Sequence, residues 1–543
     1  MLSYRKLAMR VLGRPLHTGG GIDSPRPASQ RAAALILTAA MLTTLAAPAF
    51  AETWYIENGN ITVKAGDTEG TNKVSQGTII DKVDTNTIIT NQKTDKASSN
   101  TVTIETNDKN DKVEVTLKDV NIDTSSRKKA AVSVTGEGDT NIKLDGDNAL
   151  KSDIYRSGIY GSGSLTISGG ENDSLTAQGG SGANGISSSG SLTISGGTVT
   201  ANGDDGGHGI YSRGGVTISG GSTVTANGRS GTISGGDGIR SDGGVTISGG
   251  TVNATGGNGG TISGGDGIRS GGGLTVSDGT VTAKGGNGDS KDGYGGDGIR
   301  SGGVVTISGN TVNAAGGYGG KVGGYGICSF DRVAISGGTV EAAGGNGSTG
   351  GGSGIYSSVI DLSGSLELTA KAGSPNGKAL SQNGKELDLD TINKDKLDPG
   401  AKVTAINANG DSKQVSIPRP VEPEKPVIPE ESSSSSDGGS ATPSAPASPL
   451  PGLTVTDKSG AVISYTSTQS GNTLTVCVGR FTASLRASLA ALRQLRAEGI
   501  EAITFQTILC STTLSVDELL AMGGEDAEAV LTHRLTDSSL TVG

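Results

Sequence analysis

Three copies of the heptapeptide GGDGIRS carry the residues best suited to chemistry. They place Asp237, Asp266 and Asp297 at one position and Arg240, Arg269 and Arg300 three residues later. The isoleucine between each pair is expected to face a core, so the adjacent arginine should face outward. Guanidinium groups bind carboxylates through paired hydrogen bonds, so a column of arginines would suit uronic-acid chains, whose charges repeat along the polymer.

The repeated aspartates pose an electrostatic problem. Unit charges roughly 5 Å apart repel by about 1 kcal/mol in water and by several times more near a protein surface. Calcium held between the carboxylates and glycine-loop carbonyls would offset this repulsion, and so would the neighbouring arginines. Alternatively, the column is an Asp/Arg ladder that solvates the protein and blocks lateral sheet pairing.

Two further acids extend the calcium hypothesis. Asp289 and Asp292 lie in the loop GGNGDSKDGYGGDG, which resembles calcium-binding glycine-aspartate repeats only faintly because their nine-residue period is absent. We therefore predict calcium as a cofactor with Asp237, Asp266, Asp297, Asp289 and Asp292 as its candidate ligands.

Tyrosines replace the arginines in the flanking repeats, at Tyr160, Tyr211 and Tyr356. On an outward face they could stack on the apolar faces of sugar rings, or they could simply be residues that favour β-strands. The candidate ligand-binding set therefore contains these three tyrosines and the three arginines.

Support for catalysis is thin. The chain has only three histidines, His17, His208 and His533, and it contains no P-loop, zinc motif or nucleophile elbow. A β-elimination lyase with arginine or lysine as base stays an alternative. Tandem repetition of the arginines favours a binding surface instead, because a catalytic site needs one distinct pocket.

The elements that position these residues repeat along the chain. The dipeptide Gly-Ile begins at 158, 185, 209, 238, 267, 298, 326 and 354, and each copy is followed by a VTISGG-like and, in most repeats, a TVTA-like run. Apolar and hydroxyl residues alternate within each run, which predicts short strands with one buried face. Three strands per repeat and glycine-rich corners predict a right-handed parallel β-helix over 113–417 with about ten coils, preceded by a cap and first strands over 52–112.

Composition agrees with stacked layers. The 543 residues include 93 Gly and few aromatics (Trp 1, Tyr 10, Phe 4), which argues against a large conventional core. Without a strict three-residue glycine period, collagen is excluded. Removing residues 1–51 leaves 38 basic and 53 acidic residues, a formal charge of −15, which makes nucleic acid an improbable partner.

The two ends of the chain differ from the repeats. Six basic residues, an apolar run and Ala49-Phe50-Ala51 predict a signal peptide over 1–51 and a secreted or surface location, with no transmembrane segment in the mature chain. Residues 418–451, rich in proline and serine, predict a linker to a small α+β domain over 452–543. We consider another surface component as the attachment partner of that domain. In that domain we predict a helix from Phe481 to Glu498. Whether Cys477 and Cys510 pair is left open.

Several motifs resemble a known family. WYIENGNITV, VTLKDVNID, IKLDGDNALKS and the GGDGIRS and VTISGG repeats look like the secreted carbohydrate-binding β-helix family of clostridial and gut bacteria, over approximately Glu52 to Pro418. The resemblance implies a polysaccharide-lyase-like right-handed β-helix that binds plant or acidic polysaccharide with calcium. We therefore expect a non-enzymatic polysaccharide-binding protein; the alternatives are an adhesin or surface stalk that binds protein, and a weak polysaccharide lyase.

Overall fold

The computed structural model describes residues 52–418 and, after them, 453–457, 462–463, 465–470, 472–478, 482–507, 511–522, 528–534 and 537–542. The chain divides into two compact units, 1–423 and 424–543. The predicted signal peptide and all of the predicted linker except Pro418 lie outside the described residues. None of the described helices has the length and apolarity to cross a bilayer.

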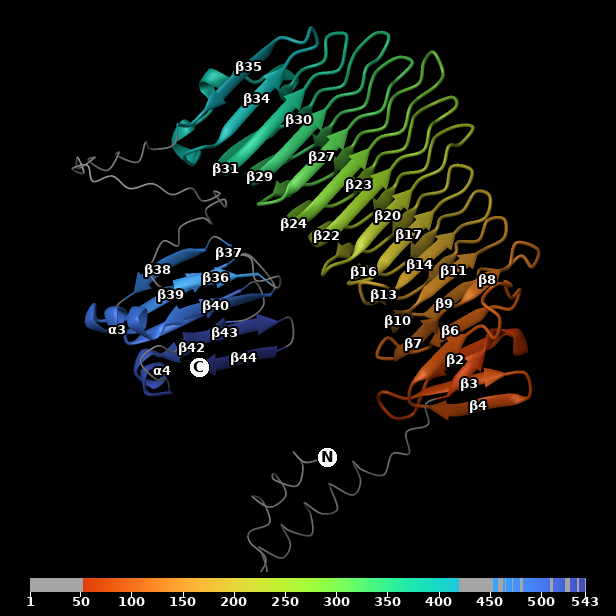
Figure 1. Ribbon diagram of the computed structural model, residues 1–543. Helices are drawn as coiled ribbons and strands as arrows, with labels where there is room; N and C mark the ends of the chain where they lie inside the picture. The colour runs from red at the N-terminus through yellow and green to blue at the C-terminus, as the bar shows by residue number, and fades with distance from the viewer. Residues whose placement is uncertain are drawn as a thin grey trace, which may run out of the picture. The chain divides into compact units, whose positions relative to one another are not determined.

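The first unit is an all-β solenoid of about 13 turns (Figure 1). Its coils contribute strands to two sheets, which we call the long sheet and the short-strand sheet. In Figure 1 the strands of successive coils lie side by side, and the loops between them project along one edge of the stack. The hand of the winding stays a prediction.

The long sheet contains 20 described strands. They are β1 (Thr53–Tyr55), β5 (Thr87–Thr90), β7 (Lys112–Lys118), β8 (Asn121–Asp123), β10 (Asp139–Asp145), β11 (Asp147–Lys151), β13 (Leu165–Ser168), β14 (Ser174–Gln178), β16 (Leu192–Ile194), β17 (Thr198–Asn202), β19 (Val216–Ile218), β20 (Thr223–Asn227), β22 (Val245–Thr255), β24 (Leu274–Lys284), β26 (Val305–Ile307), β27 (Thr311–Ala315), β29 (Arg332–Ala343), β31 (Val359–Lys371), β34 (Lys402–Ile406) and β35 (Ser412–Ser416).

The short-strand sheet contains 15 described strands. They are β2 (Ile61–Ala65), β3 (Asn72–Gln76), β4 (Ile79–Asp84), β6 (Val102–Thr106), β9 (Val132–Gly136), β12 (Ile159–Gly161), β15 (Ile186–Ser188), β18 (Ile210–Ser212), β21 (Ile239–Ser241), β23 (Ile268–Ser270), β25 (Ile299–Ser301), β28 (Ile327–Ser329), β30 (Ile355–Ser357), β32 (Leu380–Gln382) and β33 (Lys385–Glu386). Short 3₁₀ helices occupy Ile56–Asn58, Leu389–Thr391 and Lys394–Lys396.

Alternation of apolar and polar residues produces the core as predicted. In the short-strand sheet Ile239, Ile268 and Ile299 pair in parallel register and are fully buried, which makes a ladder of isoleucines inside the stack. In the long sheet Val245 pairs with Leu274 in the same way. A strand of three residues has too few contacts to be stable alone, so each coil depends on the coils on either side of it.

The predicted number of coils is wrong. The estimate of about ten coils is too low because residues 52–112 already form coils: β1 pairs with β5, and β2 with β6, in parallel. The three segments of each repeat do not form three separate sheets. The VTISGG-like and TVTA-like segments both belong to the long sheet, and in β22, β24, β29 and β31 they run on as single strands.

Antiparallel strands occupy the described ends of the stack. β3 pairs antiparallel with β2, and β4 with β3. Likewise β33 pairs antiparallel with β32, and β35 with β34. These pairs use backbone groups that the terminal parallel strands would otherwise leave open, which protects against edge-to-edge association.

Glycine has a further role in five loops, which we call the glycine loops: residues 228–238, 256–267, 285–298, 316–326 and 344–354. Their two arms hydrogen-bond to each other and to the next coil; for example, Gly257 N–H donates to Gly236 O at 2.8 Å and Gly265 N–H to Gly257 O at 2.8 Å. A Cβ on Gly265 would lie 2.0 Å from Gly236 O. Close backbone approach, rather than a left-handed backbone angle, therefore requires glycine here.

The described residues of the second unit form both strands and helices. One described sheet holds β36 (Leu453–Thr456), β37 (Val462–Ile463), β40 (Ala483–Ser488), β43 (Glu528–Arg534) and β44 (Asp537–Val542), and the other β38 (Thr466–Ser470), β39 (Thr473–Cys477), β41 (Ala502–Gln506) and β42 (Ser511–Ser515). Helices α3 (Leu489–Ala497) and α4 (Val516–Met522) complete it. Cys510 lies outside the described residues.

The predicted helix from Phe481 to Glu498 is wrong in its first half. Residues 483–488 form β40 instead, with Ala483, Leu485 and Ala487 buried on one face. Their spacing of two residues is that of a strand. Ser488 ends the strand and caps the helix, because its Oγ accepts the Ala491 N–H at 3.2 Å.

Candidate functional site

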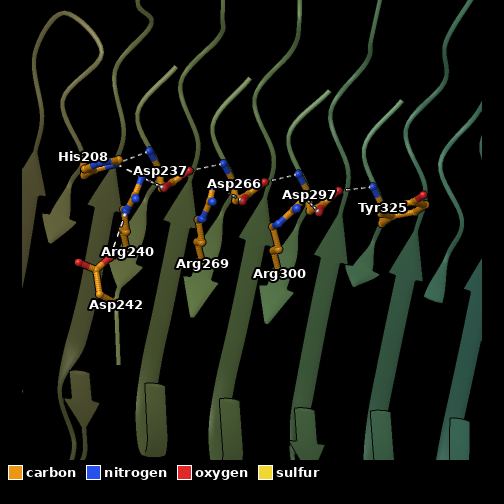
Figure 2. A network of polar contacts seen from close by, with 9 residues as sticks. All are labelled: His208, Asp237, Arg240, Asp242, Asp266, Arg269, Asp297, Arg300 and Tyr325. Carbon is orange, nitrogen blue, oxygen red and sulfur yellow. Dashed lines mark hydrogen bonds and ion pairs between the residues drawn. The ribbon is translucent and has the colours of Figure 1, made fainter. Parts of the chain in front are cut away.

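The arginines form a column on the outer face of the short-strand sheet. Arg240 pairs in register with Arg269, and Arg269 with Arg300, so each stands one coil from the next. Their side chains are 35%, 44% and 36% exposed. Figure 2 shows the three side chains projecting from successive strands on one face. We call Arg240, Arg269 and Arg300 the arginine column.

The tyrosines predicted as sugar contacts continue this column with interruptions. Tyr211 pairs directly with Arg240, and its ring centroid lies 5.9 Å from the guanidinium carbon. Ser187 stands between Tyr160 and Tyr211, and Cys328 stands between Arg300 and Tyr356. The structure thus aligns all six predicted ligand-binding residues, although only four of them are consecutive.

Two aromatic residues beside the column were missed from the sequence. Phe330 lies 5.1 Å from the Arg300 guanidinium, measured from its ring centroid. Tyr325 stacks on Tyr356 with 4.9 Å between ring centroids. Neither residue occupies the arginine position of a repeat, so the repeat alignment carried no signal for them.

The aspartates Asp237, Asp266 and Asp297, which we call the aspartate column, are buried at 4%, 5% and 4% exposure. They therefore do not solvate the surface, contrary to the ladder considered above. Each Oδ1 accepts the backbone N–H of the equivalent residue in the next coil at 2.7 Å: Asp266, Asp297 and Tyr325, in turn (Figure 2). The carboxylates thus hold neighbouring coils together.

The same position makes this bond with other side chains in earlier coils. Asn184 Oδ1 accepts the His208 N–H at 2.9 Å, and His208 Nδ1 accepts the Asp237 N–H at 2.8 Å. What these residues share is a side-chain acceptor directly before Gly-Ile. Charge does not reveal this pattern, because asparagine, histidine and aspartate differ in charge and share only the ability to accept a hydrogen bond.

Each aspartate also pairs with the arginine three residues later. The distances from arginine Nη1 to aspartate Oδ2 are 3.8 Å for Arg240, 3.8 Å for Arg269 and 3.2 Å for Arg300. Asp242 Oδ1 additionally lies 3.6 Å from Arg240 Nε. Arginine thus offsets the aspartate repulsion, one of the two solutions considered from the sequence.

Burial dominates the protonation of these groups. Burial, and next the carboxylate one coil away, raises the pKa of Asp266 and of Asp297 to about 7. Burial also raises the pKa of Asp237. It lowers the pKa of His208 to about 4, with further contributions from Arg240 and Arg269. Near neutral pH the column therefore holds fewer negative charges than its three carboxyls suggest.

Asp266→Asn should change how stability depends on pH. The Asp266 pKa is raised above its unfolded value, so its contribution to stability is present below about pH 4 and is lost as pH rises through about 7. The asparagine Oδ1 can still accept the Asp297 N–H, as Asn184 does for His208. We expect the melting temperature of the variant, taken relative to that of wild type, to be several degrees higher at pH 8 than at pH 5.

Melting curves of wild type, Asp266→Asn and the exposed-site control Asp289→Asn at both pH values check this expectation. Taking differences between variant and wild type removes the opposite contribution of His208, which both proteins share. An Asp266→Asn variant whose difference from wild type stays constant from pH 5 to pH 8 would contradict the raised pKa.

A groove of about 540 Å³ runs beside the two columns. The arginine and aspartate columns line it together with residues of the glycine loops, including Tyr294, Gly295 and Gly323. Tyr294 is 45% exposed. A ligand in this groove would meet three guanidinium groups spaced by one coil each, about 4.8 Å apart.

In the aspartate column, which we predicted as a calcium site, the Oδ1 atoms accept backbone N–H groups and the Oδ2 atoms face arginines. Among the residues that the structure describes, no three His, Cys, Asp or Glu side chains are grouped as metal ligands. Asp289 and Asp292 are exposed in the glycine loop 285–298, whereas Asp297 of the same loop is buried.

Comparisons with known proteins bear on the solenoid. No curated protein and no solved structure matches the chain. Residues 94–351, which include both columns, the groove, Tyr160 and Tyr211, match the model of a family described as "Carbohydrate-binding domain-containing protein".

Proposed function

We propose that this protein is exported and binds acidic polysaccharide along the groove beside the arginine column, without catalysing its cleavage. The observation that carries the proposal is the in-register alignment of Arg240, Arg269 and Arg300 on one exposed face. The family match over 94–351 supports carbohydrate as the class of ligand. The predicted signal peptide supports export.

The geometry suits a polymer better than a single sugar. Successive arginines are one coil apart, a step of about 4.8 Å that is similar to the length of one sugar residue. A chain lying parallel to the solenoid axis can thus present one carboxylate to each guanidinium. The buried aspartates hold the arginines from below, which lowers the entropy lost when a ligand binds.

The triple variant Arg240→Gln, Arg269→Gln, Arg300→Gln tests the proposal. We expect its affinity for polygalacturonate to fall at least tenfold, because three charge-assisted contacts are lost while side-chain length and polarity are kept. Wild-type affinity should also fall as salt rises, since exposed charges are screened over about 10 Å at 0.1 M salt. Isothermal titration with polygalacturonate and with a neutral glucan measures both effects.

A matched control removes three positive charges from the outer face of the long sheet: Lys284→Gln, Arg332→Gln, Lys371→Gln. These residues are exposed on β24, β29 and β31. The control should bind polygalacturonate like wild type. If it loses as much affinity as the column variant, net charge rather than the column determines binding.

Calcium assistance stays part of the proposal, with Asp289 and Asp292 as the accessible candidate ligands. Repeating the titration with calcium and with a chelator tests it: affinity should be higher with calcium. A glycan array that shows no binding under either condition would favour the adhesin or stalk, and unsaturated sugar products would reveal a lyase.

A further inference from the structure

A second pocket of about 580 Å³ lies on the same face, nearer the N-terminus. Thr103, Ser133, Tyr160 and Ser187 line it, and these residues pair in register from β6 to β15. They occupy the same position in their strands as the arginine column does further along. The pocket is therefore an earlier stretch of one continuous face.

The charge of this pocket sets it apart. Lys128, Lys129 and Arg156 line it, and no acidic residue does. None of these three cations forms an ion pair with any residue that the structure describes. In a chain with a formal charge of −10, three neighbouring unpaired cations attract an anion.

Two other grooves of the described solenoid lack this property. In the groove beside the arginine column, each arginine faces an aspartate. A pocket of about 600 Å³ on the long sheet has one lysine, Lys112, among the acids Glu69, Glu114 and Asp139. The N-terminal pocket is thus the more strongly cationic of the three.

The exposed ring of Tyr155 lies at the edge of the N-terminal pocket. Tyr155 is 77% exposed and has φ of 59°, a left-handed conformation that non-glycine residues rarely adopt. Its N–H donates to Ser181 O at 2.9 Å, and its ring covers Gly182, where a Cβ would lie 2.9 Å from Tyr155 Cε1. A strained backbone conformation of this kind persists only where the surrounding structure imposes it, and such conformations are concentrated at functional sites.

Partly buried hydrogen bonds hold the two loops that carry these groups. Asp153, 7% exposed, accepts the Lys128 N–H at 2.6 Å and the Ile154 N–H at 2.6 Å. Thr124 Oγ1 donates to Lys129 O at 2.7 Å. The pocket is therefore formed before any ligand arrives.

We infer that this pocket is a second subsite, which binds one carboxylated sugar unit. The carboxylate lies against Lys128, Lys129 and Arg156, and the apolar face of the ring stacks on Tyr155 or Tyr160. This inference rests on the proposed function and extends its site. Tyr160 stands three coils before Arg240, about 14 Å away at the strand spacing, so a short oligosaccharide fills one subsite while a longer chain reaches both.

Titration calorimetry of the full mature chain with trigalacturonate tests the subsite. Four proteins are compared: wild type, the arginine-column variant, the pocket variant Lys128→Gln, Lys129→Gln, Arg156→Gln, and Tyr155→Ala. We expect two binding sites in wild type, one in each triple variant, and at least a fivefold weaker pocket site in Tyr155→Ala. All four changed pocket residues are exposed, so melting temperatures should stay near that of wild type.

Each outcome separates the two proposals. A pocket variant that binds like wild type, with an arginine-column variant that binds nothing, overturns the subsite and leaves the arginine groove standing. A pocket variant that loses all binding, with an unaffected arginine-column variant, supports the pocket and overturns the groove. Absence of trigalacturonate binding in wild type overturns both, and equal binding of neutral galactotriose overturns the role of the cations.

Discussion

Replacing Gly265 by alanine should destabilise the solenoid by about 3 kcal/mol or more. The new Cβ would lie 2.0 Å from Gly236 O and 2.4 Å from Gly236 C, both backbone atoms of the preceding loop. The Gly265 N–H also donates to Gly257 O at 2.8 Å, so relief of the clash would break a hydrogen bond between the two arms of its loop. Overpacking against backbone is costly because no side chain can rotate away.

Gly221→Ala provides the matched control. A Cβ at Gly221 would meet no atom within 4 Å, and its φ is not in the left-handed region. The free energy of unfolding of this variant should lie within about 0.5 kcal/mol of that of wild type. Urea unfolding followed by circular dichroism compares the two; equal midpoints would mean that the glycine loops are not packed backbone to backbone.

Ile268→Asp should cost several kcal/mol, because it places a carboxylate in the fully buried isoleucine ladder. Ile268 pairs with Ile239 on one side and Ile299 on the other, and all three side chains are 0% exposed. The neighbours in that ladder are isoleucines, which cannot hydrogen-bond to a carboxylate. The cost of removing the charge from water therefore opposes folding of the coil. Since each coil stabilises its neighbours, the loss should spread along the stack.

Ile262→Asp is the control for this second change. Ile262 lies in the glycine loop of the same coil and is 53% exposed. The same substitution there should change the unfolding midpoint little. If Ile268→Asp unfolded at the same urea concentration as Ile262→Asp, the assignment of inward and outward residues in the short-strand sheet would be wrong.

These expectations link stability to the proposed binding site. Gly264 and Gly296 line the groove, and each packs closely against the backbone of a neighbouring loop, as Gly265 does. On the side of the glycine loops, the wall of the groove therefore includes bare backbone between side chains such as that of Tyr294. A ligand beside the arginine column would meet carbonyl and amide groups on that side, which can hydrogen-bond to sugar hydroxyls.

The sequence alone predicted a β-solenoid and the inward or outward facing of residues in its regular repeats, but not its number of coils. Alternation within runs such as Val216-Thr217-Ile218 is a local property, and stacking simply repeats it from coil to coil. For that reason the outward column of Arg240, Arg269 and Arg300 was predictable. The helix predicted from Phe481 begins too early because its leucines have a helical spacing, and Leu485 fits a strand and a helix equally well.

Only the tertiary structure decided what the polar residues do. Asp266 is found to be buried and bonded to the coil after it, and its pKa is raised first by this burial and then by the carboxylate of Asp237, 29 residues away along the chain. The pocket at Tyr155 depends on loops from separate coils, which no repeat alignment brings together. The repeated sequence determines the path of the backbone and the direction in which side chains face. Burial, protonation and pocket shape depend instead on distances between coils, which cannot be read from the sequence.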